Sequence, residues 1–370
     1  MTTQSIPVRR QRVGCEQLRR LEPIRALSGM RLRELSDLCL GETMSRGVNP
    51  IHWPGAQQQS IYLLSGELKL AFPDGSSNVL VGGSGASLWP LTRRPPAPCS
   101  AKAITDVELV RIDDEVLDIM MTWDQLSAGA APAQRFAEHA DWPRMSGAFR
   151  LQNLTEGVLA RLPSASIDAL FSRFERVVAK AGEVLVREGD AGDFYYIIDS
   201  GRCAVTRTVG GVEMLLAELK SGDAFGEEAL VAESVRNASV IMRSDGVLLR
   251  LKKIDFIELL REPLLHRVSF AEARQKVAAG AQWLDVRYPA EYRNDRLPGA
   301  LNVPLDEIRN AIGGLDRSPE YIVYCQSGRR SSAAAFLLAQ RGYRACWLEG
   351  GFLAGSSAGG EHGDGQADHE

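Results

Sequence analysis

The segment from Cys325 to Ser331, called here the cysteine loop, places a nucleophile beside two cations. Cys325 ends an apolar stretch and precedes an alanine-rich stretch typical of a helix, so loop N–H groups and the helix N-terminus should face its sulfur. Arg329 and Arg330 add positive charge, and Gly328 permits a backbone conformation that a residue with Cβ resists. Such surroundings favour the thiolate, the reactive form of cysteine. The pattern predicts nucleophilic chemistry at Cys325; the alternative is a buried cysteine that happens to end a strand.

The cysteine loop is one of four motifs within residues 268–354. One reads W-L-D-V-R-Y-P-A-E-Y at 283–292, and another reads L-P-G-A-L-N-V-P at 297–304. The loop itself reads C-Q-S-G-R-R-S, and L-E-G-G-F follows at 348–352. Together these motifs resemble the rhodanese family of sulfurtransferases.

The resemblance implies a ping-pong reaction that needs no cofactor. Cys325 would take sulfane sulfur from an anionic donor such as thiosulfate, hold it as a persulfide, and pass it to a thiophilic acceptor. Asp285 and Arg287 would organise the loop, acting on catalysis only indirectly, and Arg296 stands where the family often has histidine, which bears on fine specificity. The other implied residues of the active-site loop are Gln326, Ser327, Gly328, Arg329 and Arg330.

Cysteine-dependent phosphatases offer an alternative for the same loop. Their cradle has the pattern C-x5-R, with arginine six positions after cysteine. Here Ser331 stands at that position and Arg330 stands one position earlier. The shorter loop suits a sulfur-sized substrate better than a tetrahedral phosphate ester.

A second group of functional residue types lies between Phe225 and Ser239. It reads F-G-E-E-A-L at 225–230 and R-N-A-S at 236–239. This run resembles the phosphate-binding cassette of cyclic-nucleotide-binding domains, and the likeness covers about residues 154–260. The resemblance implies that Glu227 accepts a hydrogen bond from the ribose 2′-hydroxyl and that Arg236 binds two phosphate oxygens. The other implied binding residues are Gly226, Ala229, Asn237, Ala238 and Ser239.

The expected regulatory ligand is cAMP or cGMP. Asn237 does not decide between the two bases, although the family usually has a small or hydroxyl residue there. The alternative is that Glu227 and Arg236 are surface charges on a β-roll that binds no nucleotide.

An internal repeat precedes and includes this segment. Residues 61–70 resemble residues 196–205, and the Ser-Gly turns at Gly66 and Gly201 lie 135 residues apart. Residues 110–112 match residues 249–251 at a shift of 139. Each copy begins with a helical pattern and continues as short strands broken by glycine. The pattern predicts two small all-β rolls, of the double-stranded β-helix or jelly-roll type, with flanking helices.

The first copy lacks the residues of the nucleotide cassette. At the shift of 139, Leu88 and Ala97 stand where the second copy has Glu227 and Arg236, and no carboxylate lies between residues 74 and 106. We therefore expect a degenerate roll with a structural or pairing role.

After about residue 265 the pattern changes to alternating helices and strands. Helices are expected over 270–279 and 331–340, and strands over 283–286 and 321–325. This alternation predicts an α/β domain with a parallel sheet. The predicted division is a degenerate roll (1–135), a cyclic-nucleotide-binding domain (136–265), a rhodanese domain (266–355) and a disordered tail (356–370).

Composition narrows the functional class. The chain has 370 residues and a net charge of −4, which does not favour a nucleic-acid binder held by bulk electrostatics. Its six cysteines are scattered without metal-ligand pairs, so we expect free thiols and no metal site. No apolar run approaches the roughly 20 residues of a membrane span, and the N-terminus is polar. We expect a cytoplasmic protein, a homodimer, with no membrane partner.

Three functions fit these observations. In the first, nucleotide binding at Glu227 and Arg236 alters access to Cys325 or to its acceptor, which requires the nucleotide to bind two states differently. In the second, the rolls mediate assembly, bind no nucleotide, and leave the sulfurtransferase constitutive. The third, a transcription factor, is disfavoured because the rhodanese-like segment stands where a helix-turn-helix would be.

Overall fold

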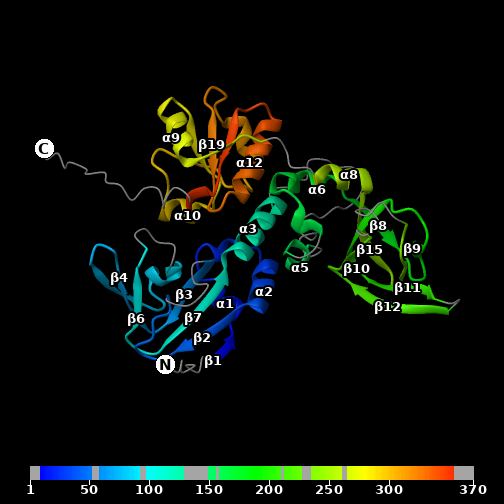
Figure 1. Ribbon diagram of the computed structural model, residues 1–370, viewed down its shortest axis with the longest axis horizontal. Coiled ribbons are helices and arrows are strands. Elements are labelled where there is room, and N and C mark those ends of the chain that lie inside the picture. Colours follow the sequence, from blue (N-terminus) through cyan, green and yellow to red (C-terminus); the bar gives the residue numbers. More distant parts are fainter. Residues whose placement is uncertain are drawn as a thin grey trace.

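The computed structural model describes residues 9–51, 58–91, 97–128, 149–155, 158–209, 212–226, 235–260 and 265–353. These residues form two all-β units and one α/β unit (Figure 1). Helix α3 (Asp114–Ala128) leaves the first all-β unit and packs against helices of both other units. None of the described helices is long and apolar enough to cross a membrane.

The first β-roll consists of two antiparallel sheets with strand orders β1-β2-β7-β3 and β5-β4-β6. Side chains alternate along its strands as a half-buried sheet requires, so Leu68 and Leu70 are buried while Lys69 between them is exposed. Its strands are β1 (Arg9–Arg12), β2 (Leu40–Met44), β3 (Gln59–Ser65), β4 (Glu67–Ala71), β5 (Ser77–Val81), β6 (Ser100–Ala103) and β7 (Val107–Asp113). Its other helices are α1 (Cys15–Leu18), α2 (Gly29–Leu38) and the 3-10 turns Ile24–Ala26 and Gly85–Leu88.

The second β-roll repeats this arrangement with sheets β13-β10-β15-β8 and β12-β11-β14-β9. Its strands are β8 (Glu175–Ala179), β9 (Val184–Val186), β10 (Phe194–Ser200), β11 (Arg202–Val209), β12 (Val212–Lys220), β13 (Ala224–Phe225), β14 (Ser239–Met242) and β15 (Gly246–Lys252). The helical elements around it are α5 (Leu151–Thr155), α6 (Ile167–Arg173), α8 (Lys253–Leu259) and the 3-10 turns Val158–Arg161 and Ser164–Ser166.

Strand pairing in the two rolls follows the shifts of the sequence repeat. The β3–β7 ladder is irregular between Leu63 and Ser65, and the β10–β15 ladder is irregular between Ile198 and Ser200, 135 residues later. In each roll a glycine with positive φ follows the irregularity and turns the chain into the next strand. A Cβ on Gly66 would lie 2.3 Å from the carbonyl oxygen of Asp106, so the turn excludes any other residue.

The α/β unit contains the predicted parallel sheet, in the order β16-β20-β19-β17-β18. The helices and strands expected for this unit are confirmed within two residues at each end. Its strands are β16 (Arg267–Val268), β17 (Gln282–Asp285), β18 (Leu301–Asn302), β19 (Tyr321–Tyr324) and β20 (Ala345–Leu348). Its helices are α9 (Phe270–Ala278), α10 (Pro289–Asn294), α11 (Ile308–Ala311), α12 (Arg329–Gln340) and the 3-10 turn Ile312–Gly314.

One hydrophobic core runs through all three units. A single cluster of buried side chains includes Trp123 of α3, Leu249 of the second roll and Val323 of the parallel sheet. Helix α12 also packs against the 3-10 turn Ser164–Ser166. The three units are therefore not separated by solvent along this core, and the predicted domain bounds stay a prediction.

Candidate functional site

The cysteine loop connects the end of β19 to the start of α12. Every residue of β19 is buried, so the strand delivers Cys325 into the interior, where it is 0% exposed. Its Sγ accepts hydrogen bonds from the backbone N–H groups of Gly328, at 3.2 Å, and Ser331, at 3.4 Å, and donates to Ser331 Oγ at 3.6 Å. Two backbone donors aimed at one sulfur can stabilise a thiolate or a persulfide.

Gly328 gives the loop its shape. It precedes the first turn of α12 with a φ of 109°, a region that L side chains rarely adopt. A Cβ at this position would also lie 3.0 Å from the ring of Trp347. The conformation that aims the Gly328 N–H at Cys325 is therefore available to glycine alone.

Asp285 and Arg287 support the loop from the neighbouring strand end. The Arg287 guanidinium contacts Asp285 Oδ2 at 2.7 Å, and both side chains are almost fully buried. Arg287 Nη1 also donates to Gln326 Oε1 at 3.2 Å, which joins this pair to the residue after the cysteine. Arg287 lies over the ring of Phe352, 4.5 Å from its centroid. The pair thus holds Gln326 in place without reaching the sulfur itself.

Arg330 is held by a carboxylate that the sequence pattern did not mark as functional. Its guanidinium donates to Glu291 Oε2 at 2.8 Å and to Glu291 Oε1 at 3.0 Å. Burial alone would raise the pKa of Glu291, but the charge and hydrogen bonds of Arg330 outweigh it and lower that pKa. Arg329, in turn, lies 3.5 Å from Glu115. Both cations expected beside the sulfur are therefore paired with carboxylates, and the donors that reach Cys325 are backbone N–H groups.

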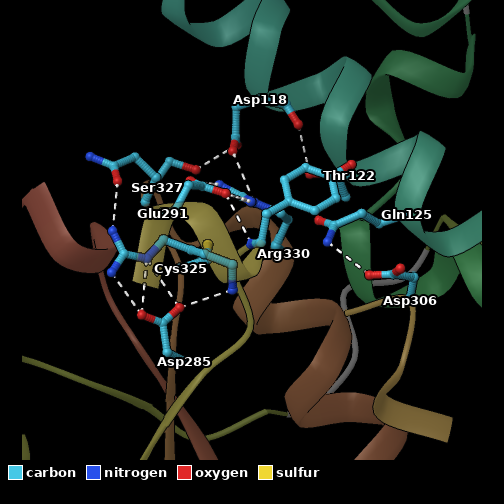
Figure 2. A network of polar contacts seen from close by, with 12 residues as sticks. Asp118, Thr122, Gln125, Asp285, Glu291, Asp306, Cys325, Ser327 and Arg330 are labelled. Atoms are coloured by element: carbon cyan, nitrogen blue, oxygen red, sulfur yellow. Dashed lines mark hydrogen bonds and ion pairs between the residues drawn. The ribbon is translucent and has the colours of Figure 1, made fainter. Parts of the chain in front are cut away.

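A second residue that the sequence did not point to comes from α3. Asp118 Oδ2 accepts a hydrogen bond from Ser327 Oγ at 2.5 Å, and Oδ1 lies 3.7 Å from Arg330 Nε (Figure 2). The carboxylate also lies 3.5 Å from Arg329 Nε. Asp118, Thr122 and Gln125 are all buried polar residues at helical spacing within an apolar stretch. In the sequence, this row of polar residues within an apolar helix indicates a buried polar contact, but it does not indicate which residue is the partner.

The structure brings together part of the nucleotide cassette. Arg236 is only 6% exposed, and its guanidinium donates to the carbonyl oxygens of Gly226, at 2.8 Å, and Phe194, at 2.7 Å. Glu227 and Ala229 lie outside the described residues. Asn237 is exposed and Ala238 is buried.

Ser239 lies at the start of β14, where its Oγ accepts from the backbone N–H of Glu188 at 2.9 Å. In the first roll, Leu88 ends a 3-10 turn and its carbonyl accepts from the Glu22 N–H at 2.8 Å.

Two protein-family models match this chain, and each covers one of the two candidate sites. The model of the cyclic nucleotide-binding domain matches residues 176–262, and that of the rhodanese-like domain matches residues 269–358. The cyclic AMP receptor protein of Thermus thermophilus is 34% identical over 157 residues, which are 42% of this chain and 70% of that protein. Thiosulfate sulfurtransferase PspE of Escherichia coli is 38% identical over 69 residues, 18% of this chain and 66% of that protein.

Other similar proteins share only a part with this chain. The cAMP-dependent protein kinase regulatory subunit of Dictyostelium discoideum is 32% identical over 130 residues, and the chain spans 40% of its length. The crystal structure of the Thermus thermophilus catabolite activator protein is 36% identical, over 26% of this chain and 46% of that chain, with a TM-score of 0.25.

Proposed function

Because the chain belongs to the cyclic nucleotide-binding family of the cyclic AMP receptor protein and also carries a rhodanese-like domain, we propose that it is a sulfurtransferase regulated by a cyclic nucleotide. The observation that supports the catalytic half most directly is the geometry of Cys325. Its sulfur receives the N–H groups of Gly328 and Ser331 at the start of α12. In this proposal Cys325 is the nucleophile, residues 326–330 form its loop, and Asp285 and Arg287 position that loop.

The proposed reaction has two displacement steps. The Cys325 thiolate attacks the sulfane sulfur of thiosulfate, the sulfur–sulfur bond of thiosulfate breaks, and sulfite leaves with the bonding electron pair. The product on the protein is an anionic persulfide, which the two N–H groups stabilise. A thiophilic acceptor such as cyanide or a thiolate then attacks the outer sulfur, and Cys325 departs as thiolate.

The test of this half is sulfur transfer from thiosulfate to cyanide. We expect turnover by the full chain, none by Cys325→Ser, and near-normal turnover by Cys346→Ser. Cys346 is a matched control because it is also buried and lies on the strand next to β19. Mass spectrometry of the tryptic peptide 318–329 after thiosulfate alone should show one added sulfur atom. Equal activity of the full chain and Cys325→Ser would contradict the assignment.

We further propose that the second roll binds cAMP or cGMP. The proximity of Gly226 and Arg236 supports a phosphate site at this position, and Glu227 is assigned to the ribose hydroxyl. Calorimetry should show heat with one of the two nucleotides and none for Arg236→Ala. Arg236→Lys should bind weakly, because an ammonium group keeps the charge but lacks the planar fork. The transfer rate should change when that nucleotide saturates the protein.

One observation favours the alternative, a roll that serves assembly and binds no nucleotide. The Arg236 guanidinium already donates to two backbone carbonyls, which act as internal substitutes for phosphate oxygens. In that case neither nucleotide gives heat in calorimetry, and the rate of sulfur transfer is the same with and without each nucleotide.

In the main proposal, the first roll (1–135) binds no nucleotide, the second roll (136–265) binds it, and the α/β unit (266–355) performs the sulfur chemistry. The homodimer stays a prediction.

A further inference from the structure

Helix α3 of the first β-roll carries a carboxylate onto the cysteine loop. Asp118 is 8% exposed, and its Oδ2 accepts from Ser327 Oγ at 2.5 Å and lies 3.5 Å from Arg329 Nε. Its Oδ1 lies 3.7 Å from Arg330 Nε (Figure 2). A hydroxyl and two guanidinium groups of one loop thus converge on a residue that lies more than 200 positions earlier in the chain.

These donors are the groups that an anion approaching Cys325 would use. Hydroxyl and guanidinium groups donate hydrogen bonds to sulfonate-like and carboxylate oxygens alike. A carboxylate that already accepts from them leaves fewer donors available to a second anion. A fixed negative charge also repels an incoming anion in an environment of low dielectric constant. Cys325 itself has no exposed surface in this arrangement. The contact with α3 therefore opposes an anionic donor by charge, and access to the buried sulfur requires an element packed beside the loop, such as α3, to move.

We propose that α3 is a closing element of the sulfurtransferase site and that Asp118 occupies the place of the anionic sulfur donor. The inference rests on the proposed function, in which Cys325 accepts sulfur from an anion. It gives a function to the first β-roll, which lacks the residues of the nucleotide cassette and had no assigned role. The roll supplies the residue that the donor must displace.

The bonding of Asp118 fits a contact that opens. Among the described residues, Asp118 Oδ1 and Arg330 Nε are both buried without a hydrogen-bond partner, although they face each other. Buried polar atoms left unbonded destabilise the arrangement that contains them, and opening would let water or a donor oxygen satisfy both. Asp124 of the same helix differs, because it accepts from Ser28 N–H at 2.8 Å and Ser28 Oγ at 2.6 Å within the first roll. The helix is thus fastened to its own roll more completely than to the cysteine loop.

Helix α3 also has a path to the second roll. The centroid of the Trp123 ring lies 5.4 Å from that of Phe149 and 5.8 Å from that of Phe171. Phe171 belongs to α6, the helix that directly precedes the strands of the second roll. A shift of α6 would move the helix that carries Asp118. A nucleotide that binds the open and closed arrangements with different affinity would then change access to Cys325.

The charge component is tested by alkylating Cys325 with two reagents of similar size, neutral iodoacetamide and anionic iodoacetate. The rate at Cys325 is followed in the full chain by mass spectrometry of peptide 318–329, in which it is the single cysteine. Asp118→Asn should raise the iodoacetate-to-iodoacetamide rate ratio about tenfold, and kcat/KM for thiosulfate by a similar factor. Glu115→Gln removes a carboxylate of the same helix whose side chain is 76% exposed, and it should change the ratio less than about twofold.

The cover component is tested by loosening α3 without changing its charge. Gln125 Nε2 donates to Asp306 at 3.1 Å, a contact of α3 with the α/β unit that does not involve the cysteine loop. Gln125→Ala should raise the rate with neutral iodoacetamide, which reports on cover alone, and the rate with iodoacetate at least as much, because Asp118 moves with the helix.

Two results would overturn the proposal. One is an unchanged or lower ratio in folded Asp118→Asn. The other, decisive on its own if Asp118→Asn does not fold, is unchanged rates in Gln125→Ala. Alkylation needs no turnover, so a chain that alkylates as expected but transfers no sulfur would contradict the proposed function and leave the α3 contact standing.

Discussion

Arg330 and Glu291 form two hydrogen bonds, of 2.8 and 3.0 Å, at a place where neither side chain is more than 6% exposed. Removing one partner leaves the other charge buried and unpaired, so Arg330→Met and Glu291→Met should each lower the free energy of unfolding by about 3–5 kcal/mol. The double variant should lose less than either single variant, since it removes both members of the pair together. Urea unfolding of the three variants measures this. Additive losses would show that the pair is not coupled as the geometry requires.

The same pair predicts a dependence of stability on pH. Burial would raise the pKa of Glu291, but Arg330 outweighs it and the pKa lies below its ordinary value. A carboxyl whose pKa is lowered by folding stabilises the fold above its unfolded pKa of about 4.3 and loses that contribution as the pH falls through the folded pKa. The urea midpoint should therefore fall more steeply below about pH 4 in the wild type than in Arg330→Met/Glu291→Met. Parallel curves would contradict the assignment of this titration to Glu291.

Gly328 and Gly280 allow a matched test of the cysteine loop. Both have positive φ, 109° and 105°, but a Cβ on Gly328 would meet Trp347 at 3.0 Å whereas a Cβ on Gly280 would meet nothing within 4 Å. Each alanine variant should lose about 1–2 kcal/mol of stability from backbone strain. Only Gly328→Ala should also lose transfer activity, by at least about tenfold, because it displaces an N–H that faces the sulfur. Steady-state kinetics with thiosulfate and cyanide distinguishes the two, and equal activity would show that the loop tolerates the displacement.

The sequence predicted well what is local in the chain. The strand before Cys325, the helix after it and the positive φ at Gly328 all follow from short patterns, because a buried strand and a helix start each leave a mark within about ten residues. The pairing of Asp285 with Arg287 could be predicted for the same reason, since the two residues lie two positions apart on one turn.

Contacts between distant segments could not be predicted in this way. Asp118 was hidden because its partners lie beyond residue 326, and helical spacing shows only that a polar face is buried. Glu291 appeared as one letter of a motif, and the partner that gives it a role comes 39 residues later. The expected charge interaction between Arg330 and Cys325 is present, but the carboxylates that pair with Arg329 and Arg330 were not predicted. Tertiary packing supplies each with a carboxylate, which no local pattern shows.

The aromatic cluster around Phe149 gives a last prediction, about the link between α3 and the second roll. Phe149 is 1% exposed, and its ring contacts those of Trp123 and Phe171. Phe149→Ala should cost about 3–5 kcal/mol of stability, since it leaves a cavity in the shared core. It should also raise the iodoacetamide rate at Cys325, because α3 loses the aromatic contact of its Trp123 with Phe149.

Phe270→Ala is the matched control, because the ring of Phe270 stacks on Trp283 within the α/β unit. It should lower stability without raising the alkylation rate, as it leaves the support of α3 intact. If the two variants affect Cys325 equally, access depends on the stability of the α/β unit and not on the position of α3. If Phe149→Ala alone raises the rate, the position of α3 controls access to the cysteine, and the helical segment before the second roll controls the position of α3.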